Sequence, residues 1–493
     1  MLAKIIVLSV YALVIITIGI IGMRKTKSFS DFLLGGGNVG PWMSAFSYGT
    51  AYFSAVLFIG FAGKIGWQFG YSSLWIALIN ALIGVMGVWL ILGWRIRKMS
   101  EEYKVHTLSE FLEKRYNSPF LKLLSAIVIF VFLVPYSTAV FMGLSYLFTT
   151  NFDISYLYAL LFMGGFTAIY LVLGGYKSMA MIDMFFGAIM VFGVIILFTS
   201  TLNKGGGMSE INFSLNQIDP RLTNPLTPPP GWWPLFSLIF LTSVAPFAMP
   251  QLVQKFYSIR DRRSVKIGTY ASTAFAVIIG GVAYFLGSTT RVFLTPIDNP
   301  SAFSSSGQPL FDRLMPEMLT HVIPPSLSVL VLLLILSASM STLAALVLIS
   351  SSSFTKDFVA GFIHKGIKDH QMTSLMRIMS LFFIGVSVFL AYLEPSSIVS
   401  ILGISWGALG SFFLGPFIWG LLNRKVRKHA AYISGIAGLA TCLVLYVYGM
   451  SSPEAGTIGM ITSLLLPMIV DPNCLRRSSG TTTLPVQGTT TLH

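Results

Sequence analysis

The chain has 493 residues, of which 54% are hydrophobic and only 10% are charged. A soluble globular protein carries about 25% charged residues, so this composition excludes a chain that exposes most of its surface to water. Apolar runs of about 20 residues recur along the whole sequence, each long enough to cross a bilayer core roughly 30 Å thick as a helix. The sequence therefore predicts an all-α polytopic membrane protein.

Hydrophobic runs between polar breaks predict thirteen membrane-spanning helices. The predicted spans are 3–23, 42–69, 72–95, 121–147, 155–175, 181–202, 232–256, 267–290, 322–354, 375–393, 396–422, 428–448 and 455–470. The first run ends in a basic stretch rather than in a small-residue cleavage site. We therefore interpret it as a span and not as a signal peptide.

The net charge of +14 reflects membrane topology rather than a nucleic-acid partner. Basic residues gather in alternate loops, at 24–27, 95–122, 255–266, 356–377 and 424–428. Cytoplasmic loops collect Lys and Arg, and an external N-terminus places 26 of the 32 basic residues on the cytoplasmic side. We therefore expect a protein of the cytoplasmic (plasma or inner) membrane, with its N-terminus outside and its C-terminus in the cytoplasm.

An external connection at about 203–231 divides the chain into two halves. It contains clusters of Gly and Pro and no apolar period, so we expect no helix there. Each half opens with an interrupted hydrophobic run. The interrupting residues are Gly49, Gly60 and Gly63 in the first half and Pro246 and Pro250 in the second. Such paired interruptions indicate inverted repeats around a midplane binding site, although Gly and Pro also kink or pack ordinary membrane helices.

Ala338, Ser341 and Thr342 are related as i, i+3 and i+4 in one apolar run, so they share a helix face. A carbonyl and two hydroxyls there offer neutral oxygen ligands to a monovalent cation, provided that an unwound helix opposite adds free carbonyls. Thr50 and Phe53 can supply those carbonyls. Hydroxyls in membrane helices also commonly bond back to their own helix or to a neighbour, so the spacing alone leaves both interpretations open.

Asp183 lies in an apolar run, where a carboxylate is a candidate coupling-ion ligand, proton carrier or partner of a buried cation. The alternative is a helix N-cap near the cytoplasmic interface. The sequence contains no nucleophile elbow, zinc-ligand spacing, phosphate loop or dinucleotide fingerprint in the required context, so we expect no enzymatic activity. The energy for any transport would come from an ion gradient.

Several motifs resemble those of the sodium:solute symporter family, which includes proline, pantothenate, sialic acid and sodium–glucose transporters. The most specific are Gly174-Gly175-Tyr176-Lys177-Ser178 followed by Asp183 and Gly187, Met340-Ser341-Thr342 followed by Lys356-Asp357, and Met249-Pro250-Gln251 ahead of Lys255-Phe256. Two further stretches look most like the pantothenate-type branch, namely Thr50-Ala51-Tyr52-Phe53-Ser54-Ala55 and Ile218-Asp219-Pro220. The resemblance covers roughly residues 5–470.

This resemblance implies a leucine-transporter-like fold with a 5+5 inverted repeat. The repeats would be 42–202 and 232–393, with an extra helix and linker at 1–41, the external loop at 203–231 and three further helices at 394–470. Residues 471–493 look like a disordered tail or an expression remnant.

The resemblance also implies the sites. The family's common sodium site maps onto the carbonyls of Thr50, Phe53 and Ala338 and the hydroxyls of Ser341 and Thr342. The solute would lie beside the sodium ion, and the candidate residues are Ser54, Ala55, Tyr136, Thr242 and Trp406. No Arg lies in the run 121–147, where one would pair a sialic-acid carboxylate, so the identity of the solute stays open.

We therefore expect a secondary active transporter, monomeric, that couples inward sodium flow to uptake of a small organic solute by alternating access. Three alternatives remain: a proton-coupled carrier that uses Asp183, a membrane-embedded transferase, and a channel or non-transporting sensor. Relatives that bind a second sodium ion use hydroxyls where this chain has Ala344 and Ala345, so we expect one sodium ion per solute. Asp183 would then serve the cytoplasmic release path or act as a structural cap.

Overall fold

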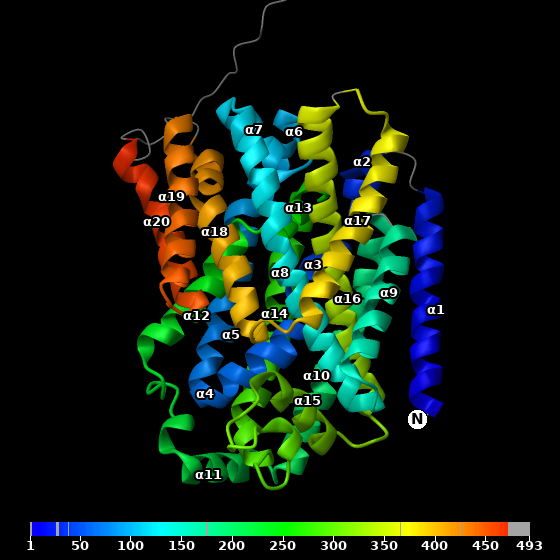
Figure 1. The fold of residues 1–493 in the computed structure, drawn as a ribbon, viewed down its shortest axis with the longest axis vertical. Helices are drawn as coiled ribbons and strands as arrows, with labels where there is room; N and C mark the ends of the chain where they lie inside the picture. The colour runs from blue at the N-terminus through cyan, green and yellow to red at the C-terminus, as the bar shows by residue number, and fades with distance from the viewer. Residues whose placement is uncertain are drawn as a thin grey trace, which may run out of the picture.

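The computed structural model describes residues 2–25, 29–37, 39–173, 176–364, 366–423 and 425–471, which form a bundle of long helices (Figure 1). Eleven described helices are long and apolar enough to cross a membrane, which confirms the predicted all-α membrane class. Gly174 and Gly175 of the resemblance motif, and the basic-cluster residues Lys27, Lys365 and Arg424, lie outside the described residues. Of the expected tail at 471–493, residues 472–493 lie outside as well, whereas Asp471 is described and buried.

The helical segments follow one another with short connections; α denotes α-helices and η denotes 3-10 or π-helical segments. Those before the external connection are α1 (Leu2–Lys25), α2 (Phe29–Leu34), η1 (Gly35–Gly37), α3 (Pro41–Tyr52), η2 (Val56–Gly66), α4 (Trp67–Phe69), η3 (Gly70–Ser73), α5 (Leu74–Ile79), η4 (Asn80–Gly87), η5 (Trp89–Gly93), α6 (Trp94–Tyr103), α7 (Leu108–Tyr116), α8 (Pro119–Phe152), α9 (Tyr156–Leu173) and α10 (Tyr176–Lys204).

The later segments are α11 (Met208–Ile218), η6 (Pro220–Leu222), α12 (Trp232–Val244), η7 (Ala245–Phe247), α13 (Pro250–Tyr257), α14 (Arg262–Phe293), η8 (Pro300–Ala302), α15 (Phe311–Val322), α16 (Ser328–Ser352), η9 (Ser353–Ile363), α17 (Asp369–Tyr392), α18 (Ile398–Leu422), α19 (Lys428–Val447) and α20 (Ser452–Val470).

The stretch Val56–Tyr103 makes two crossings rather than one. Its 48 residues would be roughly 70 Å long as a straight helix, about twice the thickness of the hydrocarbon core. The chain turns at Gly70, whose φ is +55° and whose Cβ, if present, would lie 2.4 Å from the Leu222 carbonyl oxygen. With the shorter apolar helix Tyr156–Ile169 in α9, the described residues contain thirteen crossing segments, as predicted.

The break in the first interrupted helix lies at Phe53 and Ser54, between α3 and η2, and not at the predicted glycines. Phe53 has an extended backbone, with φ −101° and ψ 130°. Gly49, Gly60 and Gly63 sit inside helical segments, where they allow close packing. An added Cβ would lie 2.7 Å from the Phe275 ring, 2.5 Å from Ile398 and 2.7 Å from a backbone oxygen, respectively. The prediction that these glycines interrupt the helix was wrong.

The break in the second interrupted helix falls at the predicted prolines. Pro246 lies in η7, and Pro250 is in the first turn of α13. A proline there lacks only an N–H that has no helical partner, so it starts the new helix well but cannot continue the old one.

Two other predicted boundaries were wrong. The run 322–354 was expected to be one helix, but α16 begins only at Ser328, because Pro324 and Pro325 separate it from α15. The external connection was expected to lack a helix, yet it contains α11. Ile211 and Leu215, spaced i and i+4 on α11, pack with Leu222 in a small buried cluster. The prediction of a loop without a helix overlooked this short apolar stripe.

Helix α16 runs through the centre of the molecule, where its most apolar window is wholly buried. It packs against α3, α8, α10 and α17. In Figure 1, α1 stands at one edge of the bundle and α18, α19 and α20 stand at the other, while α11 and α15 lie at the end that holds the N-terminus and α6 and α7 at the opposite end. The break after α3 therefore faces the most buried helix of the fold.

Candidate ion and solute site

The hydroxyl of Thr342 lies among backbone oxygens from two elements. On α16 it is 3.1 Å from the Ala338 carbonyl oxygen. Across from it lie carbonyl oxygens at the end of α3, at 3.1 Å for Ala51, 3.4 Å for Phe53 and 3.5 Å for Thr50. The last carbonyls of a helix have no intrahelical partner, so the break after Tyr52 is what frees these oxygens. We call Thr342 and these four carbonyls the neutral cage.

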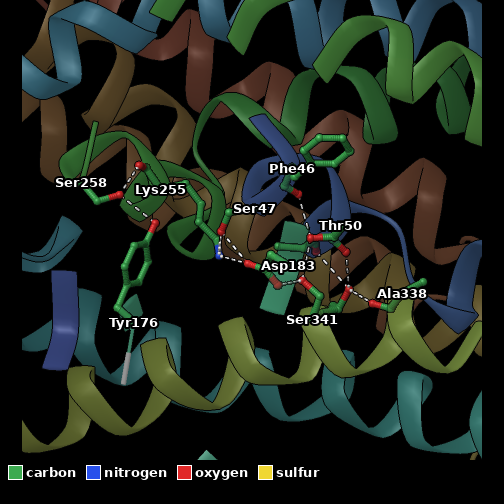
Figure 2. Close-up of polar contacts among 11 residues, drawn as sticks. Phe46, Ser47, Thr50, Tyr176, Asp183, Lys255, Ser258, Ala338 and Ser341 are labelled. Carbon is green, nitrogen blue, oxygen red and sulfur yellow. Dashed lines mark hydrogen bonds and ion pairs between the residues drawn. The ribbon is translucent and has the colours of Figure 1, made fainter. Parts of the chain in front are cut away.

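The structure thus brings Thr50, Phe53, Ala338 and Thr342 together, and it adds Ala51, which the sequence did not indicate. Which carbonyls are free depends on where the helix breaks, and no breaker residue marks Phe53. Ser341 lies at the edge of the cage. Its hydroxyl oxygen is 2.9 Å from Thr50 Oγ1 and donates to Asp183 Oδ1 at 2.6 Å (Figure 2).

Asp183 is fully buried within α10, which begins at Tyr176, so the N-cap interpretation was wrong. Both carboxylate oxygens accept hydrogen bonds from other helices. Ser341 donates to Oδ1 and Ser47 donates to Oδ2, each at 2.6 Å. The Lys255 ammonium lies 3.4 Å from Oδ2. Of the roles considered for Asp183, the partner of a buried cation matches this geometry.

Lys255 and Ser47 were not among the predicted site residues. The sequence placed Lys255 in a cytoplasmic basic cluster, but its side chain is only 4% exposed and points into the bundle from α13. It donates to Ser47 Oγ at 2.7 Å. We call Ser47, Asp183 and Lys255 the charged cluster. Figure 2 shows it directly beside Thr50 and Ser341. The available signal was a lysine within the predicted span 232–256, five residues before the next basic residue.

Four of the five predicted solute residues, Ser54, Tyr136, Thr242 and Trp406, line one cavity of about 50 Å³. Ala55 does not line it. It is fully buried against Gly143, and its N–H donates to Ser339 Oγ at 2.9 Å. Phe53 belongs to both the cavity and the neutral cage, so the two share the break after α3.

The cavity has aromatic walls. The Trp406 ring meets those of Tyr52 and Tyr136 edge to face, with ring centroids 5.8 and 5.9 Å apart. Behind the wall, the Thr242 carbonyl oxygen accepts from Tyr52 at 2.7 Å and from Asn80 at 2.6 Å. Tyr52 and Asn80 were not predicted as cavity residues. Tyr52 lies in the pantothenate-like stretch but was not singled out there, and Asn80 lies in no quoted motif.

Trp406 also offers a hydrogen-bond donor. Its buried indole nitrogen has no hydrogen bond of good geometry within the described residues, although the Tyr136 hydroxyl lies close enough to interact with it. A buried donor without an acceptor is uncommon, and in a cavity wall it points to a ligand group that would accept from it.

A model of the sodium:solute symporter family matches residues 32–438. The chain belongs to this family. The osmoregulated proline transporter of Bacillus subtilis is 25% identical over 474 residues, covering 94% of this chain and 93% of its own. The sodium/proline symporter of Salmonella typhimurium is 26% identical (89% and 87% covered), as is the sodium/pantothenate symporter of Haemophilus influenzae (87% and 87%). These values do not separate the proline branch from the pantothenate branch.

Among solved structures, a substrate-bound sodium-coupled sialic acid symporter matches with a TM-score of 0.80 at 18% identity, covering 95% of this chain and 97% of that one. A nucleobase-cation-symport-1 transporter matches with a TM-score of 0.52 at 13% identity, covering 89% and 93%. The leucine-transporter-like fold is therefore confirmed. As a sodium:solute symporter, the protein is a secondary active membrane transporter with sodium as its coupling ion.

Proposed function

We propose that one sodium ion binds in the neutral cage and that a small solute of no net charge binds in the adjacent cavity. The observation that carries the proposal is the position of Phe53. Its carbonyl oxygen belongs to the cage while its side chain lines the cavity, so occupancy of one site constrains the other. This sharing gives a physical route for reciprocal linkage, in which sodium raises solute affinity and solute raises sodium affinity equally.

The ligands of the cage suit a monovalent cation that must also leave. Neutral carbonyl and hydroxyl oxygens can replace the hydration shell of sodium, and they carry no charge that would trap the ion. Thr342 has four carbonyl oxygens around its hydroxyl, so we assign it the principal side-chain role. Ser341 would contribute from the edge, because its hydroxyl lies between Thr50 Oγ1 and Asp183 Oδ1 rather than among the cage carbonyls.

For the solute, the cavity favours a small amino acid such as proline, because no charged side chain among the described residues lines it. The cavity measures about 50 Å³, whereas a cavity that holds benzene measures roughly 150 Å³, so its walls would move apart slightly on binding. The aromatic walls suit an apolar ring, and the Trp406 N–H suits a carboxylate oxygen. Two of the relatives described above carry proline in their names, which agrees with this choice. A solute of the size of pantothenate would require the lining side chains to move much further apart.

The proton-coupled alternative is the second candidate. It would require Asp183 to exchange protons with water during transport, but this carboxylate already has an ammonium and two hydroxyls as partners. Sodium-free uptake driven by a pH gradient would favour it.

We further propose that the chain acts as a carrier rather than as a transferase or a sensor, because the buried polar groups converge on an ion cage and a solute cavity.

We also propose a monomer, since every group of the site comes from one chain, with the N-terminus outside and the C-terminus in the cytoplasm. The ends of the bundle agree with this orientation. Helices α6 and α7, which carry five of the basic residues, lie opposite the end that holds α11, α15 and the N-terminus (Figure 1).

The proposed function is tested by solute uptake into liposomes with and without an inward sodium gradient, using proline, pantothenate and sialic acid as probes. We expect concentrative uptake of proline that requires sodium. The matched variants are Thr342→Ala and Ser350→Ala, because Ser350 lies on the same helix and its buried hydroxyl finds no hydrogen-bond partner among the described residues. Proline uptake that is unaffected by sodium, or lost equally in both variants, would refute the assignment.

A further inference from the structure

Lys255 is fixed from several sides in the interior of the bundle. Its ammonium donates to Ser47 Oγ at 2.7 Å and lies 3.4 Å from Asp183 Oδ2. It also sits over the Tyr176 ring, 5.2 Å from the ring centroid, where a cation is attracted by the π face. Ser258 Oγ donates to the Lys255 carbonyl oxygen at 2.8 Å and contacts the Tyr176 hydroxyl (Figure 2). These contacts hold the Lys255 ammonium in one defined position.

A short chain of contacts leads from this ammonium to the neutral cage. Asp183 joins Lys255 to Ser341, and Ser341 touches Thr50, whose carbonyl is part of the cage. Around the Asp183 carboxylate, its two oxygens and the Ser47 and Ser341 hydroxyls are the kinds of oxygen that bind sodium. Without the lysine, these atoms would form a second cation site with a carboxylate at its centre.

We propose that the Lys255 ammonium is a built-in cation, which takes the place of a second coupling cation at Asp183. The proposal rests on the proposed function, because it takes the neutral cage as the site of the exchanging sodium ion. The ammonium already neutralises the carboxylate. A sodium ion at this second site would lie about 4 Å from the Lys255 ammonium. At the effective dielectric constant of a protein interior, the repulsion between the two cations would lower the sodium affinity of the second site by roughly a thousandfold.

The Lys255 ammonium differs from a bound sodium ion because it is covalently attached to the protein. Lys255 belongs to α13, whereas Ser47, Asp183 and Ser341 lie on α3, α10 and α16. The ammonium can shift with its helix during alternating access, but it cannot dissociate and cross the membrane. Each transport cycle would therefore move one positive charge across the membrane, that of the sodium ion in the cage, together with a solute of no net charge.

The test measures reversal potentials in liposomes for the full-length protein, Lys255→Met, Lys255→Arg and the double variant Asp183→Asn/Lys255→Met. We expect the unsubstituted full-length protein to transport one cation per solute. Lys255→Arg should keep that ratio, because the fixed positive charge is retained. Lys255→Met leaves Asp183 unpaired and moves two cations per solute. The double variant, which lacks both charges, returns to one. Sodium and proton gradients, imposed separately, identify the second cation as Na⁺ or H⁺.

A ratio of one in Lys255→Met would overturn the proposal. If Lys255→Met does not transport, its thermal stability is measured against sodium concentration and pH beside the double variant. The proposal expects Lys255→Met to be stabilised more steeply by added sodium or by lower pH, and identical responses would overturn it. Failure of the proposed function looks different, because the unsubstituted protein would then show no sodium dependence at all.

Discussion

The neutral cage and the charged cluster lie side by side in the bundle, yet they handle charge in opposite ways. The cage presents carbonyl and hydroxyl oxygens with no formal charge, so any cation that enters brings a new charge into the membrane interior. The charged cluster holds a carboxylate together with its own ammonium. The difference indicates that the neutral cage is free to exchange its cation, whereas the carboxylate of the charged cluster already has a permanent partner.

The largest expected effect comes from separating the charges of the charged cluster. Asp183→Asn leaves the buried Lys255 ammonium without its carboxylate and should destabilise the protein by about 3–5 kcal/mol, the range for an uncompensated buried charge. The double variant Asp183→Asn/Lys255→Met should recover most of this loss. Thermal unfolding in detergent at fixed sodium concentration measures both. A double variant as unstable as the single one would show that the charges are not partners.

The next effect should appear in the cage. Thr342→Ala removes the hydroxyl that four carbonyl oxygens surround, and the sodium concentration for half-maximal uptake should rise by roughly 5- to 150-fold, which corresponds to about 1–3 kcal/mol. Ser341→Ala should raise it less, because that hydroxyl mainly serves Asp183. Ser350→Ala is the control and should change nothing. An equal or larger effect of Ser341→Ala would move the sodium ion toward the charged cluster.

The smallest expected effect lies in the solute cavity. Trp406→Phe keeps an aromatic wall but removes the indole N–H, and it should weaken solute binding by roughly 2- to 13-fold, the value of one hydrogen bond of about 0.5–1.5 kcal/mol. Sodium affinity measured without solute should not change. A loss of both affinities in this variant would mean that Trp406 supports the whole fold of the site rather than the solute.

The sequence predicted features that depend on residue type along one helix. The crossing segments, the proline break between α12 and α13, and the shared face of Ala338, Ser341 and Thr342 all follow from hydrophobic length, proline chemistry and helical spacing. The break at Phe53 has no such marker. Because the position of the break was not predicted, the contribution of the Ala51 carbonyl to the cage was not predicted either.

Features that depend on contacts between distant segments could not be predicted. Lys255 was assigned to a cytoplasmic cluster because other basic residues follow it, although its partners Ser47 and Asp183 are 208 and 72 residues away in sequence. Ala55 was a plausible solute contact beside Ser54, but the turn that starts η2 directs it toward Gly143. Charge pairing and side-chain direction at a break are properties of the assembled bundle.

The central claim is that one site exchanges sodium while its neighbour carries a permanent cation. It is tested most directly by counting sodium ions at equilibrium, with radioactive sodium bound to the purified full-length protein at saturating solute. The account predicts one sodium ion per chain, lost in Thr342→Ala at the same sodium concentration and retained in Ser350→Ala. Two sodium ions bound per chain to the unsubstituted protein would contradict it.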